Sequence, residues 1–176
     1  MGFKNVTTVV MTAGLATLMS TAAFGASVVP GTIRNGSTVL NFCLNSDLNT
    51  RNQNGGIVHI WECADSSFSS SIWSFHSGGQ IRNSAGLCLD SDVNTMHQSG
   101  GIVHVWECND TPQQTWKRAT NRRIDQYGES GTVIRNSAGL CLDSDVNTMH
   151  QSGGIVHVWE CNDTLQQTWF FTPILD

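Results

Sequence analysis

The sequence has few charged residues, and acids outnumber bases among them. Only 13% of its 176 residues are charged, with 14 Asp and Glu against 9 Lys and Arg. Nucleic acid and anionic membranes bind proteins through a basic surface, which this composition does not supply. Beyond residue 25 the chain has no apolar run long enough to cross a bilayer and no apolar period of a helix. These absences exclude nucleic-acid binding, a membrane span in the mature chain and a helical fold.

Motifs of catalysis are missing as well. The sequence contains no nucleophile elbow, no metalloprotease motif and no phosphate-binding loop. A pair of carboxylates can hydrolyse a glycoside. However, Asp90 and Asp92 lie two positions apart on one strand face, and Glu107 alternates away from that face. We therefore expect neither catalysis nor a cofactor.

The first 25 residues have the pattern of a secretory signal peptide. One positive charge at Lys4 precedes an apolar stretch, and small residues then lead to a cleavage point after Gly25 or Ala26. A membrane anchor is the alternative, but the stretch is diluted by Thr and Gly, and its apolar core is short. We expect residues 1–25 to be removed and the mature chain to be exported and soluble. Loss of Lys4 leaves 8 bases against 14 acids, a net charge near −6.

The chain contains a nearly identical internal repeat. Residues Ile81–Trp116 recur as Ile134–Trp169 with one change, Pro112 against Leu165, and a diverged copy spans Ile33–Trp73. A unit of this size cannot bury its own apolar face, so like units must pack around a shared axis. We expect one domain over residues 26–176, with repeats at about 30–78, 79–128 and 129–176.

The six cysteines form three pairs with equal spacing. In each repeat the two cysteines are 20 positions apart, and the pairs are Cys43 with Cys63, Cys88 with Cys108, and Cys141 with Cys161. Six cysteines can pair in fifteen ways, but this spacing makes one disulfide per repeat the simplest arrangement. Export to an oxidising environment favours the same result.

Short strands and turns are expected throughout the mature chain. Residues 102–108 are β-branched and aromatic with alternating character, and Gly100-Gly101 before them marks a turn. Residues 87–90 predict a second strand, and residues 113–116 predict the start of a third. The fold class is therefore all-β, with about four strands per repeat.

A disulfide across neighbouring antiparallel strands also predicts their register. If Cys88 faces Cys108, then Asp90 lies opposite Trp106 and Asp92 opposite His104. In the third repeat the same register sets Asp143 opposite Trp159 and Asp145 opposite His157. Alternation then directs three apolar side chains of the second repeat to the core, those of Leu89, Val103 and Val105.

An aspartate that faces a tryptophan, beside a histidine, has the chemistry of a sugar site. Sugar hydroxyls bind a carboxylate, and the apolar C–H face of a sugar stacks on an aromatic ring. Trp106 and Trp159 could instead belong to the core, but alternation places them on the face opposite Val105 and Val158. A buried position is expected for the tryptophans that end each repeated segment, Trp73, Trp116 and Trp169.

Three motifs occur in the same order in the second and third repeats. They are Cys-Leu-Asp, then Gly-Gly-Ile-Val-His-Val-Trp-Glu-Cys, then Gln-Gln-Thr-Trp. This pattern resembles the repeat of the ricin B-type lectin family, whose hallmark is Gln-x-Trp. The resemblance covers the whole mature chain as three repeats. It implies a β-trefoil, in which three four-stranded repeats close into a barrel with a hairpin-triplet cap, and one shallow sugar pocket per repeat.

The resemblance also assigns carbohydrate-binding residues. The family's aspartate corresponds to Asp90 and Asp143, and its stacking aromatic to Trp106 and Trp159. A histidine stands two positions before the aromatic, where the family often has Gln, and a Gln replaces the usual Asn of the family's Asn-Gln pair. The implied residues are Asp90, His104, Trp106, Asn109, Gln113, Gln114, Asp143, His157, Trp159, Asn162, Gln166 and Gln167.

The first repeat departs from this pattern at the site itself. Asn45 replaces the aspartate and Ser71-Ile72-Trp73 replaces Gln-x-Trp, although His59 and Trp61 remain. Exchange of a carboxylate for an amide removes a charge-assisted hydrogen bond, at a cost of about 1–3 kcal/mol. We therefore expect the site of Asn45, His59 and Trp61 to be degenerate, with weak or no sugar binding.

We expect no metal site. Residues 90–94 resemble the start of an EF-hand loop, but Thr95 stands at its glycine position and Gly101 at its closing glutamate. A strand-end turn in which Asp92 and Asn94 hydrogen-bond to the backbone is expected instead. The histidines at matching positions would be spread around the barrel, too far apart to share a zinc ion.

The sequence as a whole indicates a secreted lectin for terminal galactose or N-acetylgalactosamine, whose partners are cell-surface glycans or polysaccharides. One alternative is the non-catalytic cell-binding subunit of a bacterial toxin, which would pair with a separate subunit. Another is a trefoil protease inhibitor, with Lys117–Ser130 as its inhibitory loop. We interpret the basic cluster in that segment as a solvated loop, with phosphate binding as the weaker alternative; it consists of Lys117, Arg118, Arg122 and Arg123.

Overall fold

The structure is a computed structural model that describes residues 28–36, 42–63, 69–125 and 128–174. The signal peptide predicted at residues 1–25 lies outside the described residues. Within the described ranges no helix is long and apolar enough to span a bilayer.

Each repeat contributes four strands. The first contains β1 (Pro30–Asn35), β2 (Phe42–Ser46), β3 (Gly56–Glu62) and β4 (Ile72–Phe75). The second contains β5 (Ile81–Asn83), β6 (Cys88–Ser91), β7 (Gly101–Trp106) and β8 (Lys117–Ile124). The third contains β9 (Ser130–Arg135), β10 (Cys141–Ser144), β11 (Gly154–Trp159) and β12 (Trp169–Pro173). Short 3₁₀ helices are η1 (Ser69–Ser71), η2 (Ser77–Gly79), η3 (Pro112–Gln114) and η4 (Leu165–Gln167).

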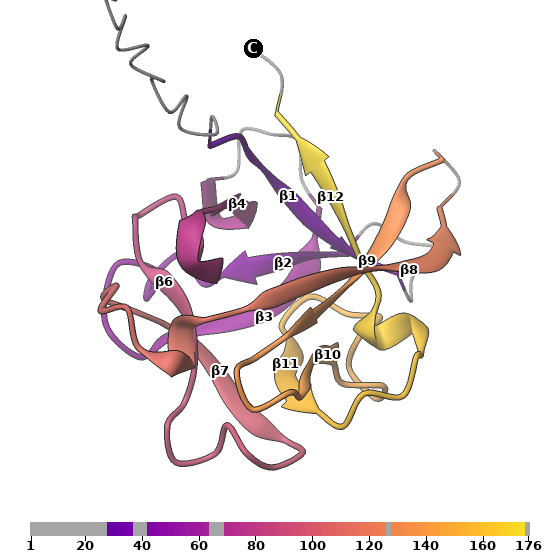
Figure 1. Cartoon of the computed structure of the whole chain (residues 1–176). Helices are drawn as coiled ribbons and strands as arrows, with labels where there is room; N and C mark the ends of the chain where they lie inside the picture. The colour runs from indigo at the N-terminus through magenta and orange to yellow at the C-terminus, as the bar shows by residue number, and fades with distance from the viewer. Residues whose placement is uncertain (1–27, 37–41, 64–68, 126–127, 175–176) are drawn as a thin grey trace, which may run out of the picture.

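The strands form two sets that share one core. β5, β4, β1, β12, β9 and β8 lie next to one another in that order, all antiparallel. The other six form the hairpins β2–β3, β6–β7 and β10–β11, and the second strands of these hairpins, β3, β7 and β11, pair with one another. Figure 1 shows β7, β10 and β11 in the lower half of the molecule and β1 and β12 at the top. This arrangement confirms the predicted all-β fold, a β-trefoil.

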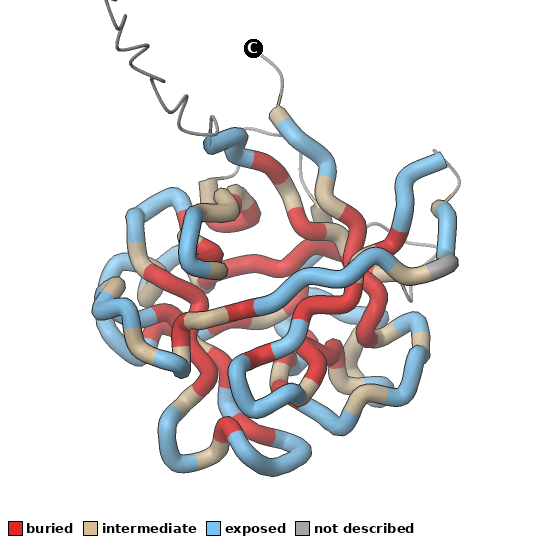
Figure 2. The backbone as a smooth tube through the Cα atoms, viewed as in Figure 1, coloured by how far each residue is buried: buried red, intermediate tan, exposed pale blue. Residues whose placement is uncertain are grey.

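The core collects the inward side chains of all three repeats. Leu44, Leu89 and Leu142, at the same place in successive hairpins, are completely buried. Val103 and Val105 join this core as predicted, and Figure 2 shows the buried chain concentrated where the strands meet. Such alternation of buried and exposed residues is what a sheet with one face on the core requires.

The tryptophans predicted to be buried are confirmed in the core. Trp73, Trp116 and Trp169 are at most 3% exposed. Each indole N–H donates to the carbonyl of the leucine in its own repeat, at 2.8 Å for Leu44, 2.8 Å for Leu89 and 2.9 Å for Leu142. A buried indole needs such a partner because an unpaired polar group in the core is costly.

The hairpins are closed by the predicted disulfides and turns. One disulfide joins the two cysteines of each repeat, with Cα atoms 5.1–5.2 Å apart. At the turn before β7, Gly100 has a φ of +84°, and a Cβ on Gly101 would lie 2.3 Å from the carbonyl oxygen of Thr95. The turn also uses Asp92 as predicted, since its carboxylate accepts the amide of Asn94 at 3.0 Å.

Two local predictions are wrong. The basic segment predicted as a loop forms β8, because its backbone pairs with that of β9, and Lys117, Arg118 and Arg123 are exposed on it. Strand β8 takes up residues 117–124 of the segment predicted as an inhibitory loop, so the described residues of that segment contain no long loop. Residues 113–116 do not start a strand either: η3 occupies Pro112–Gln114, and β8 begins after Trp116.

The two kinds of tryptophan should respond differently to substitution. Trp169→Phe leaves the buried carbonyl of Leu142 without its donor, so we expect the free energy of unfolding to fall by about 1–3 kcal/mol. Trp106→Phe changes a ring that is 38% exposed, and we expect a change within about 0.5 kcal/mol. Urea unfolding measures both, and equal losses would contradict the assignment of Trp169 to the core.

Candidate functional site

The site residues lie on one face of each hairpin, in a register different from the predicted one. Asp90 on β6 is directly opposite His104 on β7, and Trp106 is opposite Cys88. The prediction that Asp90 faces Trp106 is therefore wrong by two residues, as is the corresponding pair Asp143 and Trp159. The reason is that Cys108 lies beyond the end of β7 and reaches Cys88 diagonally. A shift of two keeps every side chain on its predicted face.

The aspartate of the second repeat is fixed by two hydrogen bonds. His104 Nε2 lies 3.1 Å from Asp90 Oδ1, and Gln114 Nε2 donates to Asp90 Oδ2 at 3.0 Å. Asp90 is only 6% exposed, so these partners offset much of the cost of burying its charge. Each carboxylate oxygen can accept a second hydrogen bond. The arrangement therefore holds the aspartate still while leaving it able to accept from a ligand hydroxyl.

The third repeat reproduces this network. His157 Nε2 lies 3.1 Å from Asp143 Oδ1, and Gln167 Nε2 donates to Asp143 Oδ2 at 2.7 Å. Asp143 is also 6% exposed, and Trp159 is 41% exposed on the same face. The two repeats thus present the same pair of groups, a buried carboxylate and an accessible indole.

Gln114 and Gln167 are buried and hydrogen-bond to the aspartates from inside the protein. Gln114 is fully buried, and its amide nitrogen also donates to the carbonyl of Glu107 at 2.9 Å. Its Oε1 accepts the backbone amide of Asn109 at 2.9 Å, and Gln167 makes the equivalent contacts. Both amide hydrogens are used, so direct ligand contact by these glutamines does not fit the structure. They position the carboxylate, which the sequence alone did not reveal.

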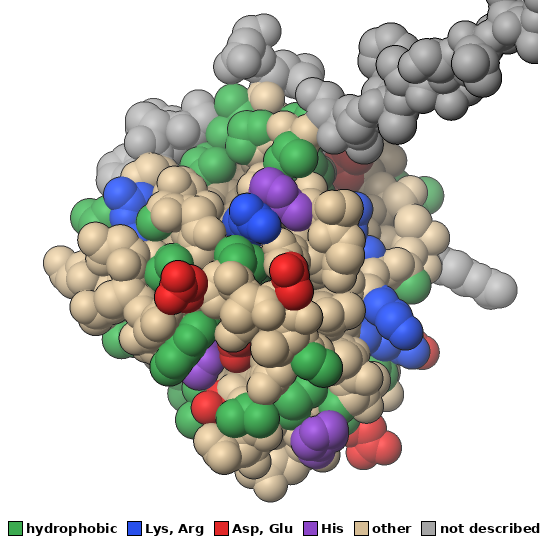
Figure 3. Space-filling model, turned by 60° about the vertical axis from the view of Figure 1, so that its left-hand side comes forward, with side chains coloured by type: hydrophobic (Ala, Val, Ile, Leu, Met, Phe, Trp, Pro, Cys, Tyr) green, Lys and Arg blue, Asp and Glu red, His purple; other side chains and the backbone are tan. Residues whose placement is uncertain are grey.

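The remaining predicted residues of the second repeat come together around a small cavity of about 130 Å³. Its lining includes Asp90, His104, Trp106, Asn109 and Gln113 from the prediction, and Asp92, Val93 and Thr111 in addition. The rings of His104 and Trp106 are 5.3 Å apart. Figure 3 shows hydrophobic, acidic and histidine side chains next to one another on the lower part of one face of the molecule.

A neighbouring repeat borders each indole. The backbone of Gly55 lies so close to Trp106 that a Cβ there would be 3.8 Å from the ring, and Asn54 Oδ1 accepts the amide of Glu107 at 2.6 Å. Gly100 borders Trp159 in the same way, and Gly153 borders Trp61. The position of each aromatic ring therefore depends on correct packing of two repeats.

The first repeat has a different hydrogen-bond pattern and a larger cavity, of about 570 Å³. Asn45 Oδ1 lies 3.0 Å from His59 Nε2, but its amide nitrogen donates to Ser71 Oγ at 2.8 Å and Ser70 Oγ at 3.0 Å. Both amide hydrogens of Asn45 are therefore engaged. Both serines line this cavity, and they are shorter than the glutamines at the same positions of the second repeat. Sequence comparison found the substitutions but not the larger cavity.

His59 differs electrostatically from an isolated histidine. Burial lowers its pKa, and the nearby carboxylate of Asp47 opposes this effect without cancelling it. Its partner Asn45 carries no charge that would stabilise an imidazolium. His59 therefore remains neutral to lower pH than a solvated histidine does.

The described part of the chain has no group of three or more His, Cys, Asp or Glu side chains placed to hold an ion. His59, His104 and His157 each contact the Asn or Asp of their own repeat.

Comparison with known proteins identifies relatives of this fold. The sequence profile of the Ricin-type beta-trefoil lectin domain matches residues 29–169. No curated protein sequence matches the chain significantly. The agglutinin of Abrus precatorius is 22% identical, with a TM-score of 0.63 over 82% of this chain and 48% of its own. The designed threefold-symmetric protein ThreeFoil is 14% identical, with a TM-score of 0.64 over 82% of this chain and 99% of its own.

A third similar structure is the β-trefoil lectin of the Vibrio vulnificus hemolysin/cytolysin with N-acetyl-D-lactosamine bound. It is 18% identical, with a TM-score of 0.58 over 86% of this chain and 98% of its own. At these identities the structural likeness shows the fold alone.

Coupling between Gln114 and Asp90 tests the positioning role. Gln114→Met and Asp90→Ala remove the two ends of one hydrogen bond, so their effects on the free energy of unfolding should be non-additive by about 0.5–3 kcal/mol. Gln167→Met combined with Asp90→Ala provides the matched control, because these residues belong to different repeats, and it should be additive within about 0.5 kcal/mol. Urea unfolding of the single and double variants decides; additivity in both cycles would argue against the network.

His59 should make stability depend on pH. Because its pKa is lower in the folded state than in the unfolded chain, the unfolded chain binds more protons as the pH falls below about 6.5. The stabilising effect of a neutral His59 is present above that pH and is lost as the pH falls toward the folded-state pKa. Unfolding at pH 7.5 and pH 5.0 should show a greater loss for the unmodified protein than for His59→Gln. A greater loss in the variant would refute the sign.

Proposed function

Because the chain belongs to the ricin-type beta-trefoil lectin family, we propose that it binds carbohydrates through two equivalent sites, in its second and third repeats. One observation carries the proposal, the buried carboxylate beside an exposed indole on the same face. Asp90 with Trp106, and Asp143 with Trp159, offer a sugar both a charged acceptor and a flat apolar surface. Hydroxyl groups and the C–H face of a pyranose need those two surfaces together.

The proposed ligands end in galactose or N-acetylgalactosamine. A similar β-trefoil binds N-acetyl-D-lactosamine, a disaccharide that ends in galactose. A small open cavity of about 130 Å³ accommodates a terminal sugar better than the middle of a polysaccharide chain. Asn109 and Gln113 at its rim would contact the sugar's outer hydroxyls, and Asn162 and Gln166 would do so in the third repeat.

The first repeat would bind the same sugar weakly or not at all. Asn45 has no charge, and both hydrogens of its amide are engaged by Ser70 and Ser71. Trp61 is still 45% exposed, so the stacking surface persists without the acceptor. We therefore assign the first repeat a structural role.

Two sites on one rigid body favour clustered glycans. Single open sugar sites bind weakly, but a second site on the same body raises avidity when both engage one surface. The protein would therefore act on cell surfaces or polysaccharides rather than on free sugars. Secretion, directed by residues 1–25, would bring it to those ligands.

The same sites could serve a toxin. A mosquitocidal holotoxin contains a similar β-trefoil, with a TM-score of 0.63, although this chain covers only 18% of that protein. In that case the chain would be the cell-binding partner of a separate subunit. Co-purification of a second chain from the native source would support this role, and recovery of the protein alone would oppose it.

Catalysis is not part of the proposal. An exo-β-1,3-galactanase of Clostridium thermocellum contains a similar β-trefoil, but this chain covers only 31% of that enzyme. Here both oxygens of Asp90 are held by hydrogen bonds within the protein. No second carboxylate lines the second-repeat cavity except Asp92, whose Oδ1 accepts the amide of Asn94 in a turn.

Removal of the two aspartates tests the proposal. We expect Asp90→Ala to lower binding to a galactose-coated surface on the order of tenfold or more, since a charge-assisted hydrogen bond is lost. The double variant with Asp143→Ala should not bind, whereas Asn45→Ala should bind as the unmodified protein does. Surface plasmon resonance measures binding, and circular dichroism verifies folding. Undiminished binding by the folded double variant would overturn the proposal.

A further inference from the structure

The two equivalent sites have different surroundings. Residues 81–116 and 134–169 are identical but for one position, Pro112 against Leu165, so the other differences between the sites come from the chain outside these segments. Arg82 of the second repeat and Arg135 of the third occupy the same place, directly opposite the first cysteine of their hairpins. The two arginines differ in the residue that is paired with them on the other neighbouring strand. Ser74 on β4 is opposite Arg82, whereas Lys117 on β8 is opposite Arg135.

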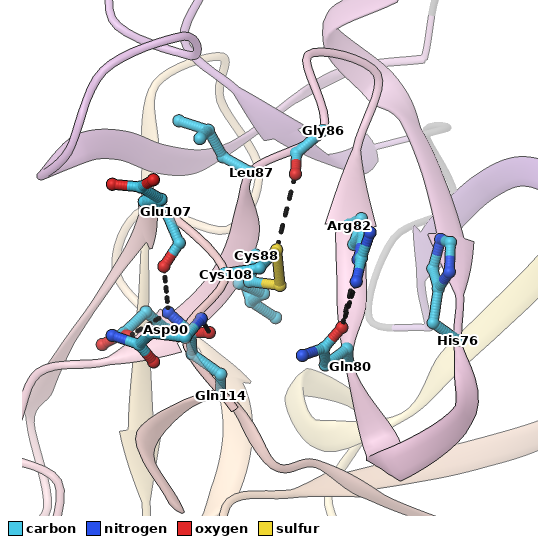
Figure 4. The surroundings of a disulfide bond; sticks show 12 residues. His76, Gln80, Arg82, Gly86, Leu87, Cys88, Asp90, Glu107, Cys108 and Gln114 are labelled. Atoms are coloured by element: carbon cyan, nitrogen blue, oxygen red, sulfur yellow. Dashed lines mark hydrogen bonds between the residues drawn. A yellow bond between two sulfur atoms is a disulfide. The ribbon is translucent and has the colours of Figure 1, made fainter. Parts of the chain in front are cut away.

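In the second repeat the arginine is held and its charge is balanced. Nη2 and Nε of Arg82 donate to Gln80 Oε1 at 2.6 and 3.1 Å, and Gln80 Nε2 donates to Asp110 Oδ1 at 2.6 Å. Figure 4 shows Gln80 and Arg82 on one side of the Cys88–Cys108 disulfide, and Asp90 and Gln114 on the other. The amide of Gln80 therefore links the guanidinium of Arg82 to the carboxylate of Asp110 beside the second-repeat site.

The third repeat lacks the link that Gln80 makes between an arginine and an aspartate in the second. Val133 stands where Gln80 stands in the second repeat, and a valine cannot join Arg135 to Asp163, the counterpart of Asp110. Lys117 lies directly opposite Arg135, and both are exposed. Among the described residues neither has a hydrogen-bond or ion-pair partner. Like charges directly across two strands are unfavourable, so an anion between them would be stabilised.

Arg123 is a third cationic side chain at the edge of the third-repeat site. Arg123 Nη2 donates to the backbone carbonyl of Asp163 at 2.7 Å, next to the candidate ligand residue Asn162. Lys117 and Arg123 thus stand beside Arg135 and Asp163 in the third repeat, and neither has a charged counterpart beside Arg82 and Asp110 on the paired strand β4, where Ser74 takes the place of Lys117. The overall negative charge of the protein opposes this only weakly, because salt screens charges more than about 8–10 Å away.

Lys117 and Arg135 lie close to Trp159, the aromatic ring on which we propose that the sugar stacks. Arg135 is opposite Cys141, and Cys141 is opposite Trp159, so one row runs from β9 across β10 to β11. Neighbouring strands are about 4.8 Å apart, which places the backbones of Arg135 and Trp159 about 10 Å from each other. The long side chain of Arg135 can shorten that gap, and a second sugar attached to one on Trp159 would extend toward it.

We propose that Lys117 and Arg135 give the third-repeat site a preference for glycans whose terminal sugar carries, or adjoins, an anionic group, while the second-repeat site binds neutral glycans equally well. This inference rests on the proposed function. The shared ligand chemistry is a sulfate or carboxylate group on a saccharide. The protein would then be a lectin with two unlike sites, able to engage a surface that displays both neutral and acidic glycans.

Single-site proteins separate the two predictions. Asp90→Ala leaves only the third-repeat site, and Asp143→Ala leaves only the second. Each is titrated with N-acetyl-D-lactosamine, its sulfated form and its sialylated form at about 0.15 M salt, where the screening length is about 8 Å. We expect the Asp90→Ala protein to bind at least one anionic form roughly twofold to fivefold more tightly than the neutral one, as fits exposed charge pairs. The Asp143→Ala protein should show no such preference.

Reciprocal substitutions locate the cause. In the Asp90→Ala background, Lys117→Ser should remove most of the preference, and Arg118→Ser should not, because Arg118 faces the other side of β8 and stacks on Phe75 at 3.7 Å. In the Asp143→Ala background, Ser74→Lys should create a preference. Salt at 0.5 M should weaken the preference wherever it occurs.

Different failures have different meanings. If both single-site proteins bind the neutral glycan, and the ratio of acidic to neutral affinity is the same in both, this inference is overturned and the proposed function stands. An unchanged ratio in the folded Lys117→Ser variant would do the same. Absence of binding to every form by both proteins, when the unmodified chain also fails to bind, would overturn the proposed function and this inference with it.

Discussion

The hydrogen bond from each buried indole to a leucine carbonyl is the constraint on which the site depends. Trp116 donates to Leu89, the residue directly before Asp90, and so fixes η3 against β6. Gln114, two residues before Trp116, is thereby placed under the carboxylate that it holds. The same bond recurs in every repeat at 2.8–2.9 Å. Core packing and ligand chemistry are therefore set by one short segment, which explains why a Gln-x-Trp pattern accompanies the aspartate.

The first repeat illustrates how such a site can lose its chemistry and keep its fold. Trp73 retains its bond to Leu44, and the disulfide and core are unchanged. At the floor of the site the direction of hydrogen bonding is reversed, because Asn45 donates to two serines where Asp90 accepts from a glutamine. A neutral amide needs no buried donors to offset a charge. The paired changes at Asn45 and Ser71 are consistent with each other and leave the barrel undisturbed.

Sequence reasoning succeeded where periodicity and spacing decide the structure. Equal cysteine spacing gave the disulfides, and alternation gave the buried Leu89 and the exposed Trp106. It failed where contacts between distant parts of the chain decide the structure. The bridge to Cys108 is diagonal because that residue lies past the strand end, which no spacing reveals, and Gln114 is buried although it is polar because Asp90 needs a donor. The segment at Lys117 became a strand through pairing with β9, since long-range pairing overrides local polarity.

We propose that two of the three exposed indoles, Trp106 and Trp159, form sugar sites and that Trp61 does not. The six tryptophan indole N–H signals of a ¹⁵N-labelled protein, assigned with single Trp→Phe variants, can be followed by NMR during titration with N-acetyl-D-lactosamine. We expect saturable shifts for Trp106 and Trp159, with the signals of Trp61 and the three buried indoles unchanged. A shift of Trp61 equal to theirs, or no shift of Trp106 and Trp159, would contradict it.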